Sequence, residues 1–196
     1  MEHKAFIFDT QAFKEELYPI IISSGLDKNP IPLYKFINNH LGKVFSPYTG
    51  ILLEADWESE LENGGIQELA DFSMTCFYSP DDDRGLSYSW DSVLEVLKNV
   101  SEKLDPKYCI LGESLEAELF LLDPGGMGTG FVEAEDVPLI YKILVESKDK
   151  VVTNGLPSRE DILYDINITE LIEAYDELVL LYKDATEAKR GLLMTF

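Results

Sequence analysis

Histidine, cysteine and tryptophan are scarce in this chain of 196 residues, which contains two of each. With only His3 and His40 available, a Ser-His-Asp or Cys-His mechanism would have to use one of them, and neither is near a GxSxG or cysteine motif. Cys76 and Cys109 occur in unrelated contexts without a CxxC, so neither a disulfide framework nor a zinc site with ordinary ligand spacing is predicted. We therefore expect free thiols, a cytoplasmic location, no metal and no cofactor.

Basic residues are also few: 16 Lys and Arg stand against 37 Asp and Glu, which gives a formal net charge of −21. Nucleic acids and anionic membranes are bound through clusters of Lys and Arg, and no basic run occurs, so we predict neither partner. No segment approaches the roughly 20 apolar residues that span a bilayer, and the start MEHKAFIFDTQAF lacks the apolar core of a signal peptide. Because 45% of the residues are hydrophobic, the acidity indicates a folded acidic domain rather than a disordered chain.

Apolar patterning predicts strands near both ends of the chain and mostly helices between them. The predicted strands are AFIFD (5–9), GFV (130–132) and LLMTF (192–196). Helices are predicted over 10–24, with a kink or break at Pro19 and a stop at Gly25, and over 32–41, 89–104, 114–122, 134–147 and 167–190. The segment 66–78 fits a helix or a strand, and 46–65 has no clear pattern. We predict one α+β domain over residues 1–196, with a small sheet, strands near both termini and several packed helices.

The segment GGMGTG at 125–130 has four glycines in six residues, as a phosphate-binding loop would. Gly125 and Gly130 have the spacing of a P-loop, but Phe131 and Val132 stand where Lys and Ser or Thr would bind phosphate and Mg²⁺. The dinucleotide pattern G-x-G-x-x-G also fails at Phe131, and acidic residues on both sides would repel an anion. We therefore predict a structural turn that uses the freedom of glycine to adopt φ > 0.

The candidate partner-binding residues are Asp81, Asp82, Asp83 and Trp57. The three aspartates lie in SPDDDRG, which its Pro, Asp and Gly content marks as a loop. An EF-hand beginning there would need glycine where Leu86 stands, so a solvated loop is favoured over a calcium site. Trp57, in ADWESE, is either a partly buried residue or an exposed aromatic anchor for a partner. No catalytic residue and no metal ligand is predicted.

From Trp90 onward the sequence resembles the YfbM-like family of small bacterial proteins of unknown function. The similar pieces are SWDSVLEVL before a helix, ILGESLE, a glycine-rich link into EAEDVPLIYKIL, and the closing ELIEAYDELVLLYKDATEAKRGLLMTF. The resemblance implies a compact single-domain α+β fold. It supplies no active-site residues.

Two functions from different classes fit these observations. The first, which we favour, is a non-enzymatic binding module, antitoxin- or immunity-like in one version, whose acidic surface engages a basic protein. The second is a small-molecule-binding protein or a carboxylate-based enzyme, which predicts a concave site with a few converging polar groups. Neither the identity of a partner nor the oligomeric state follows from the sequence.

Overall fold

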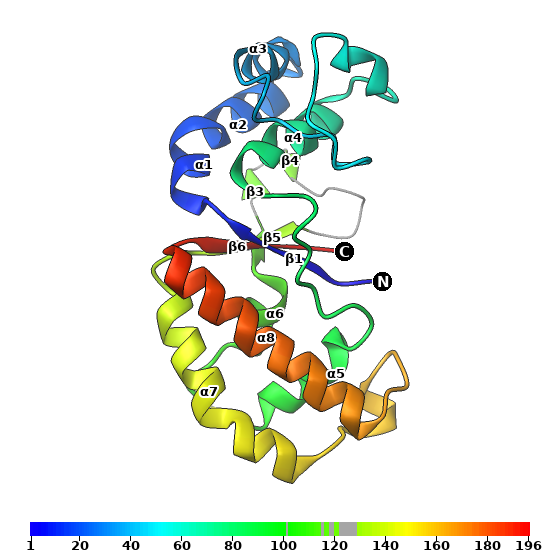
Figure 1. The fold of residues 1–196 in the computed structure, drawn as a ribbon, viewed down its shortest axis with the longest axis vertical. Helices are drawn as coiled ribbons and strands as arrows, with labels where there is room; N and C mark the ends of the chain where they lie inside the picture. Colours follow the sequence, from blue (N-terminus) through cyan, green and yellow to red (C-terminus); the bar gives the residue numbers. More distant parts are fainter. Residues whose placement is uncertain (101, 115, 118–119, 122–128) are drawn as a thin grey trace.

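The computed structural model describes residues 1–100, 102–114, 116–117, 120–121 and 129–196 (Figure 1). An antiparallel sheet in the order β1-β6-β5-β2 crosses the middle of the molecule, between two groups of helices. Its strands are β1 (Lys4–Phe8), β2 (Glu113–Ser114), β5 (Thr129–Val132) and β6 (Gly191–Thr195). β1 and β6 come from opposite ends of the chain and pair with Phe6 opposite Leu193. The predicted α+β fold, with a small sheet and strands near both termini, is confirmed.

The two faces of the sheet belong to two separate hydrophobic cores, because successive residues of a strand point to opposite sides. The first core takes Phe6, Phe8, Phe131 and Leu193 from the strands. The second core takes Ala5, Val132, Leu192 and Met194. The sheet therefore holds the two helical layers together.

Helices from the first part of the chain cover the first core. They are α1 (Thr10–Glu16), α2 (Tyr18–Asp27), α3 (Ile31–Asn39) and α4 (Ile66–Met74). The predicted break near Pro19 is confirmed, since α1 and α2 meet at Leu17. The predicted stop at Gly25 is wrong: α2 continues through Gly25 to Asp27 and is capped by Lys28, whose φ of 51° is left-handed. Glycine inside a helix costs about 1 kcal/mol, and the packing of α2 on its neighbours outweighs that cost.

The middle of the chain, which the sequence left open, forms a loop, two 3₁₀ turns and a helix. A bridge between Phe45 and Leu52 closes the loop of residues 46–51. The 3₁₀ turns are η1 (Trp57–Glu60) and η2 (Thr75–Phe77), on either side of α4. Of the two structures that fit 66–78, the helix is therefore the one adopted.

Helices from the second part of the chain cover the second core. They are α5 (Trp90–Lys98), α6 (Pro106–Leu111), α7 (Val137–Asn154) and α8 (Ile168–Ala188). α8 begins with a capping box, for which Asn167 and Glu170 have the sequence spacing: Asn167 Oδ1 accepts from the Glu170 amide at 3.1 Å, and the Glu170 carboxylate accepts from the Asn167 amide at 2.7 Å. None of the helices in the described part of the chain is both long and apolar enough to cross a membrane.

Three predicted helices differ from the structure, one of them only in its bounds: the helix predicted over 134–147 runs from Val137 to Asn154. The helix over 114–122 is wrong, because the described residues there form β2 and the short strands β3 (Glu116–Ala117) and β4 (Phe120–Leu121). Here strand pairing outweighs the local preference for a helix, because β2 pairs with β5 and Ser114 lies opposite Gly130. The helix over 89–104 ends at Lys98, and α6 begins separately after Asp105, whose carboxylate accepts from the Lys107 amide at 2.9 Å.

The glycine-rich segment is only partly described. Residues 125–128 lie outside the described residues, whereas Thr129 and Gly130 belong to β5, so the predicted turn does not extend to them. A Cβ built on Gly130 would lie 1.8 Å from the Leu111 carbonyl oxygen. Glycine at this position therefore serves the close approach of α6 to the sheet.

Candidate functional site

The segment of residues 77–87, which we call the edge segment, runs along the outer edge of β1 and carries the three predicted aspartates. The Arg84 amide donates to the Ala5 carbonyl oxygen at 2.8 Å. His3 and Ser87 exchange two backbone hydrogen bonds of 3.0 and 3.1 Å. These bonds cover an edge of the sheet that would otherwise be open to pairing with another strand.

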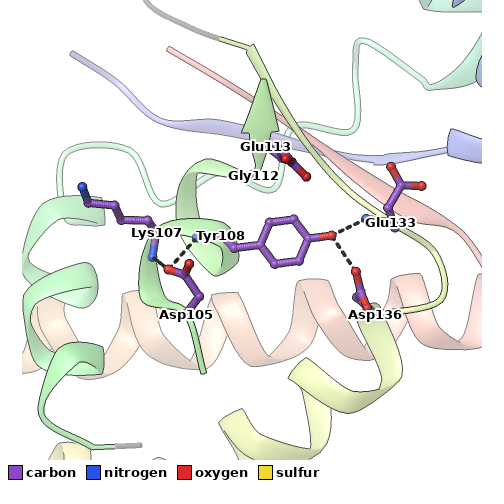
Figure 2. Close-up of a pocket in the computed structure, with 7 residues that line it drawn as sticks. All are labelled: Asp105, Lys107, Tyr108, Gly112, Glu113, Glu133 and Asp136. Carbon is purple, nitrogen blue, oxygen red and sulfur yellow. Dashed lines mark hydrogen bonds between the residues drawn. The ribbon is translucent and has the colours of Figure 1, made fainter. Parts of the chain in front are cut away.

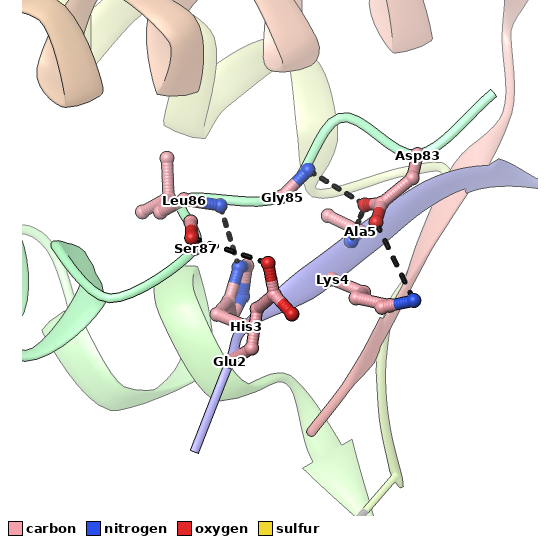
Figure 3. Close-up of polar contacts among 8 residues, drawn as sticks. All are labelled: Glu2, His3, Lys4, Ala5, Asp83, Gly85, Leu86 and Ser87. Atoms are coloured by element: carbon pink, nitrogen blue, oxygen red, sulfur yellow. Dashed lines mark hydrogen bonds and ion pairs between the residues drawn. The ribbon is translucent and has the colours of Figure 1, made fainter.

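Asp83 fixes the edge segment to β1 and is a structural residue (Figure 3). Its Oδ1 accepts hydrogen bonds from the amides of Ala5 at 3.2 Å and Gly85 at 2.9 Å. Its Oδ2 lies 4.0 Å from the Lys4 ammonium nitrogen. Of the three predicted aspartates, Asp83 is thus engaged within the protein.

Asp81 and Asp82 are exposed and form what we call the acidic rim. Arg84 anchors the segment below them, donating to the Asp184 carboxylate of α8 at 2.8 Å, and another of its nitrogens lies 3.8 Å from Asp82. Asp81 faces the loop of residues 46–51, because a Cβ built on Gly50 would lie 2.5 Å from Asp81 Oδ1. The structure therefore brings the acidic rim next to a loop some thirty residues earlier in the chain.

A groove of about 300 Å³ opens between the edge segment, the loop of residues 46–51, α4 and the ends of β1 and β6. We call it the aromatic groove. Its lining includes Phe6, Tyr48, Met74, Tyr78, Pro80 and Phe196, together with the polar residues Lys4, Asp71 and Thr195. The Phe6 and Tyr78 rings pack with their centroids 4.7 Å apart. The acidic rim follows directly after Pro80, so charge and aromatic surface meet at one place.

The polar groups of the aromatic groove are oriented by their surroundings. Burial raises the pKa of the Tyr78 hydroxyl far above its ordinary value, and the charge of Asp71 adds to this effect. Tyr78 is therefore a neutral hydroxyl at the side of the groove. Among the described lining residues Lys4 is the one basic residue, and its ammonium group is directed towards Asp83 (Figure 3).

A buried carboxylate holds the outer wall of the groove. The Tyr48 hydroxyl donates to Glu68 Oε1 at 3.1 Å, while Glu68 Oε2 accepts from the amides of Asn63 at 3.0 Å and Gly64 at 2.7 Å. Burial alone would raise the pKa of Glu68, but these donors outweigh it and lower the pKa below its ordinary value. On this wall the side chains of Tyr48 and Ile51 remain exposed, with 55% and 64% of their surface accessible to solvent.

Trp57, the fourth predicted partner-binding residue, lies in the interior with 1% of its surface exposed. Its Nε1 donates to Asn38 Oδ1 at 3.1 Å, and its ring packs against Tyr34 and Phe72. The indole therefore presents no surface to a partner, and the interpretation as an exposed anchor is corrected. The acids around it in the sequence point outwards while the ring fills the first core.

A second hollow, of about 500 Å³, lies between α6 and the beginning of α7 and is lined mostly by acids (Figure 2). The Tyr108 hydroxyl donates to Asp136 Oδ2 at 2.7 Å and accepts from the Glu133 amide at 3.0 Å. The Glu133 carboxylate pairs with Lys14 at 2.6 Å, and Asp105 caps α6. These polar groups already join α6 to the connection between β5 and α7, so we interpret this hollow as structural.

The histidines and cysteines, which nucleophilic or metal chemistry would use, do not line the aromatic groove. His3 is buried, and His40 ends α3 with Nδ1 2.8 Å from the Phe36 carbonyl oxygen. Cys76 and Cys109 are free thiols, and burial raises the pKa of each to about 12, opposite to the shift that activates a thiol. Within the described ranges, no three His, Cys, Asp or Glu side chains come together in a way that could hold a metal ion.

Comparisons with protein-family models, with curated proteins and with solved structures find no match to this chain. The candidate site, the aromatic groove with its acidic rim, is therefore inferred from the structure of this chain alone. Sequence reasoning placed two of its residues, Asp81 and Asp82, in a loop, and it missed Tyr48, Tyr78 and Phe196. The available signal was a tyrosine close to a proline, directly after it in SPYTG and two residues before it in YSPDDD, a pattern that by itself indicates only turns.

Proposed function

We propose that this protein is a cytoplasmic, non-enzymatic binding module that engages a basic segment of a protein partner through its aromatic groove and acidic rim. The observation that supports this function is the position of Asp81 and Asp82 directly beside a groove with aromatic walls. Lys and Arg have long apolar stems that pack on such walls while their charged ends pair with carboxylates. The net charge of −21 adds a long-range attraction for a basic partner.

The size of the groove favours a protein side chain as its occupant. Pockets for small molecules hold roughly 300–1,000 Å³, and the groove, at about 300 Å³, is at the lower end of that range. One or two large side chains fill such a space. The exposed Tyr48 and Ile51 extend the apolar surface beyond the groove, as a contact with a chain segment requires.

An antitoxin- or immunity-like role is the narrower form of this proposal, with a basic toxin as the partner. The resemblance to the YfbM-like family accompanies the proposal as a hypothesis about ancestry and contributes no functional residue.

The second candidate function, a small-molecule-binding protein, is favoured by one specific observation. The aromatic groove contains both an acid, Asp71, and a base, Lys4, between aromatic rings. This combination suits a small zwitterion with an apolar side chain. Binding of such a molecule by the isolated protein, with no effect of the acidic rim, would favour this candidate over the first.

The direct test measures binding of fluorescent basic peptides of about twelve residues that contain one aromatic residue. We expect binding at low salt to weaken at least about tenfold when the salt is raised to about 0.5 M, because exposed charge pairs are screened. The variant Asp81→Asn/Asp82→Asn should bind more weakly. The matched control Asp149→Asn/Glu160→Gln removes two exposed charges from α7 and η4 (Arg159–Asp161), in the other helical layer, and should bind as the wild type does. Equal binding by the two double variants would overturn the proposal.

A further inference from the structure

The charged groups that line the aromatic groove are engaged within the protein. The Asp71 carboxylate accepts a hydrogen bond from Gln67 Nε2 at 3.3 Å. The Lys4 ammonium nitrogen lies 4.0 Å from Asp83 Oδ2 (Figure 3). The acidic rim, in contrast, is exposed. The groove therefore suits an uncharged part of the partner segment, and the rim suits a charged part.

Aromatic rings and prolines make up most of the remaining lining of the groove. The Phe6 and Tyr78 rings pack together, and the Tyr48 ring packs edge-on against Phe72 with 5.5 Å between the centroids. These contacts hold the rings in place, so they form a surface that loses little freedom when it is covered. The rings and prolines of the lining are Phe6, Pro47, Tyr48, Tyr78, Pro80 and Phe196.

We propose that the aromatic groove takes the proline residues of a basic partner segment in the polyproline II conformation. This inference rests on the proposed function and specifies the sequence of the partner segment. Grooves lined by aromatic side chains are a recurrent binding surface for this conformation, which the free segment already adopts before it binds. Proline also loses no side-chain entropy on burial.

A β-strand of the partner suits the groove less well. The edge segment occupies the edge of β1 beside the groove, where the Arg84 amide donates to the Ala5 carbonyl oxygen at 2.8 Å. A strand would also bring peptide N–H groups into the groove, and each buried donor needs an acceptor. Proline has no N–H, so a segment that places prolines in the groove avoids this penalty.

The geometry of polyproline II sets the spacing of the prolines. This helix has three residues per turn, so prolines at positions i and i+3 lie on one face. Asp81 and Asp82 follow Pro80 of the lining directly, so basic residues next to the prolines extend from the groove to the rim. The expected ligand is a P-x-x-P segment flanked by Lys or Arg.

The test compares two fluorescent peptides of equal length. One has P-x-x-P between flanking lysines, and the other has alanine in place of both prolines. For the wild-type protein we expect the proline peptide to bind at least about tenfold more tightly, because alanine removes both the rings and the preformed conformation. Fluorescence anisotropy at low salt measures both affinities.

Variants of exposed tyrosines locate this preference in the groove. Tyr48→Ala removes a ring from the wall and should abolish most of the preference for proline, whereas Tyr48→Phe keeps the ring and should retain it. Tyr88→Ala is the matched control and should also retain it, because Tyr88 is exposed to a similar extent, 50%, but does not belong to the lining described above. Circular dichroism and the thermal midpoint establish that each variant is folded. The comparison of the two peptides on the wild type depends on no variant.

The acidic-rim variant Asp81→Asn/Asp82→Asn provides the contrasting result. It should weaken the binding of both peptides by the same factor and preserve the preference for proline. The two sets of variants therefore separate the contribution of the groove from that of the rim.

The outcomes distinguish this inference from the proposed function. Equal binding of the two peptides, with a loss for both in the rim variant, would overturn the proline inference and leave the proposed function intact. An unchanged preference in Tyr48→Ala would place the prolines outside the groove and overturn the inference too. The same holds if a basic peptide with an aromatic residue in place of the prolines binds more tightly than the proline peptide. Absence of binding by all these peptides would overturn both.

Discussion

His3 Nδ1 accepts a hydrogen bond of 3.0 Å from the Leu86 amide, and on the other side of the ring Nε2 lies 2.8 Å from the Ile110 carbonyl oxygen. These two partners require a neutral imidazole that carries its proton on Nε2. The ring is 1% exposed and also packs edge-on against Phe196, 5.2 Å away. One side chain near the N-terminus thus joins the edge segment, α6 and the C-terminal end of the chain.

The buried imidazole predicts a loss of stability in acid. Burial lowers the pKa of His3 from 6.5 to about 4, so the folded state binds fewer protons than the unfolded state between these values. The contribution of His3 is therefore complete above pH 6.5 and falls as the pH is lowered towards 4. Near pH 5 the loss amounts to about 2 kcal/mol. Urea unfolding of wild type and His3→Gln should show a difference that shrinks by this amount between pH 7 and pH 5, and a constant difference would contradict the prediction.

We expect Glu68 to stabilise the wall of the groove, and replacing its carboxylate tests this. Glu68→Gln replaces a carboxylate that accepts from backbone amides with a group that also carries donors, so buried amide hydrogens lose their acceptor. The expected loss in the free energy of unfolding is about 2–3 kcal/mol, the range for hydrogen bonds to charged groups. Glu60→Gln, on the 3₁₀ turn η1, is the control and should change stability by less than about 0.5 kcal/mol. Comparable losses in both variants would contradict the structural role of Glu68.

Two glycine substitutions should separate steric crowding from backbone strain. Gly130→Ala would place a methyl group 1.8 Å from the Leu111 carbonyl oxygen, so the strand or α6 must move. We expect a loss of at least about 3 kcal/mol, at the upper end of the range for overpacking. At Gly155 φ is 68° and ψ is −154°, a conformation that is essentially restricted to glycine, and no atom lies within 4 Å of a Cβ built there. Gly155→Ala should therefore cost about 1–3 kcal/mol through backbone strain alone. Chemical denaturation of both variants gives the comparison, and equal costs would show that crowding at β5 is relieved without penalty.

Trp57 predicts a spectroscopic result as well as a loss of stability. Trp57→Phe should reduce the free energy of unfolding by about 1–3 kcal/mol, because the smaller ring leaves space where the buried indole packs against Tyr34 and Phe72. The variant Trp90→Phe retains only Trp57, whose emission should be blue-shifted and shielded from iodide. Trp57→Phe retains only the half-buried Trp90 and should be quenched more strongly. Equal quenching of the two variants would contradict the burial of Trp57.

Local patterns of the sequence were sufficient for several elements. The capping box at Asn167, the break at Pro19 and the strand AFIFD all depend on neighbouring residues, so they could be predicted without knowledge of the fold. The helix predicted over 114–122 failed for the opposite reason: its strand pairing depends on β5, which the local sequence does not reveal. Of the two interpretations of Trp57, the exposed anchor is excluded, because the burial of its ring depends on α3 and α4, which the local sequence does not reveal.

Composition and short-range periodicity specify the α+β class, the strong negative charge and the loop that carries Asp81 and Asp82, so these features follow from the amino-acid sequence alone. The folded chain is needed to show that one groove beside those aspartates is lined by Tyr48, Asp71, Tyr78 and Phe196. These residues come from four separate segments, and the pairing of β1 with β6 is one of the contacts that bring the segments together. Contacts between distant segments are set by the packing of both cores on the sheet, and no local pattern encodes them.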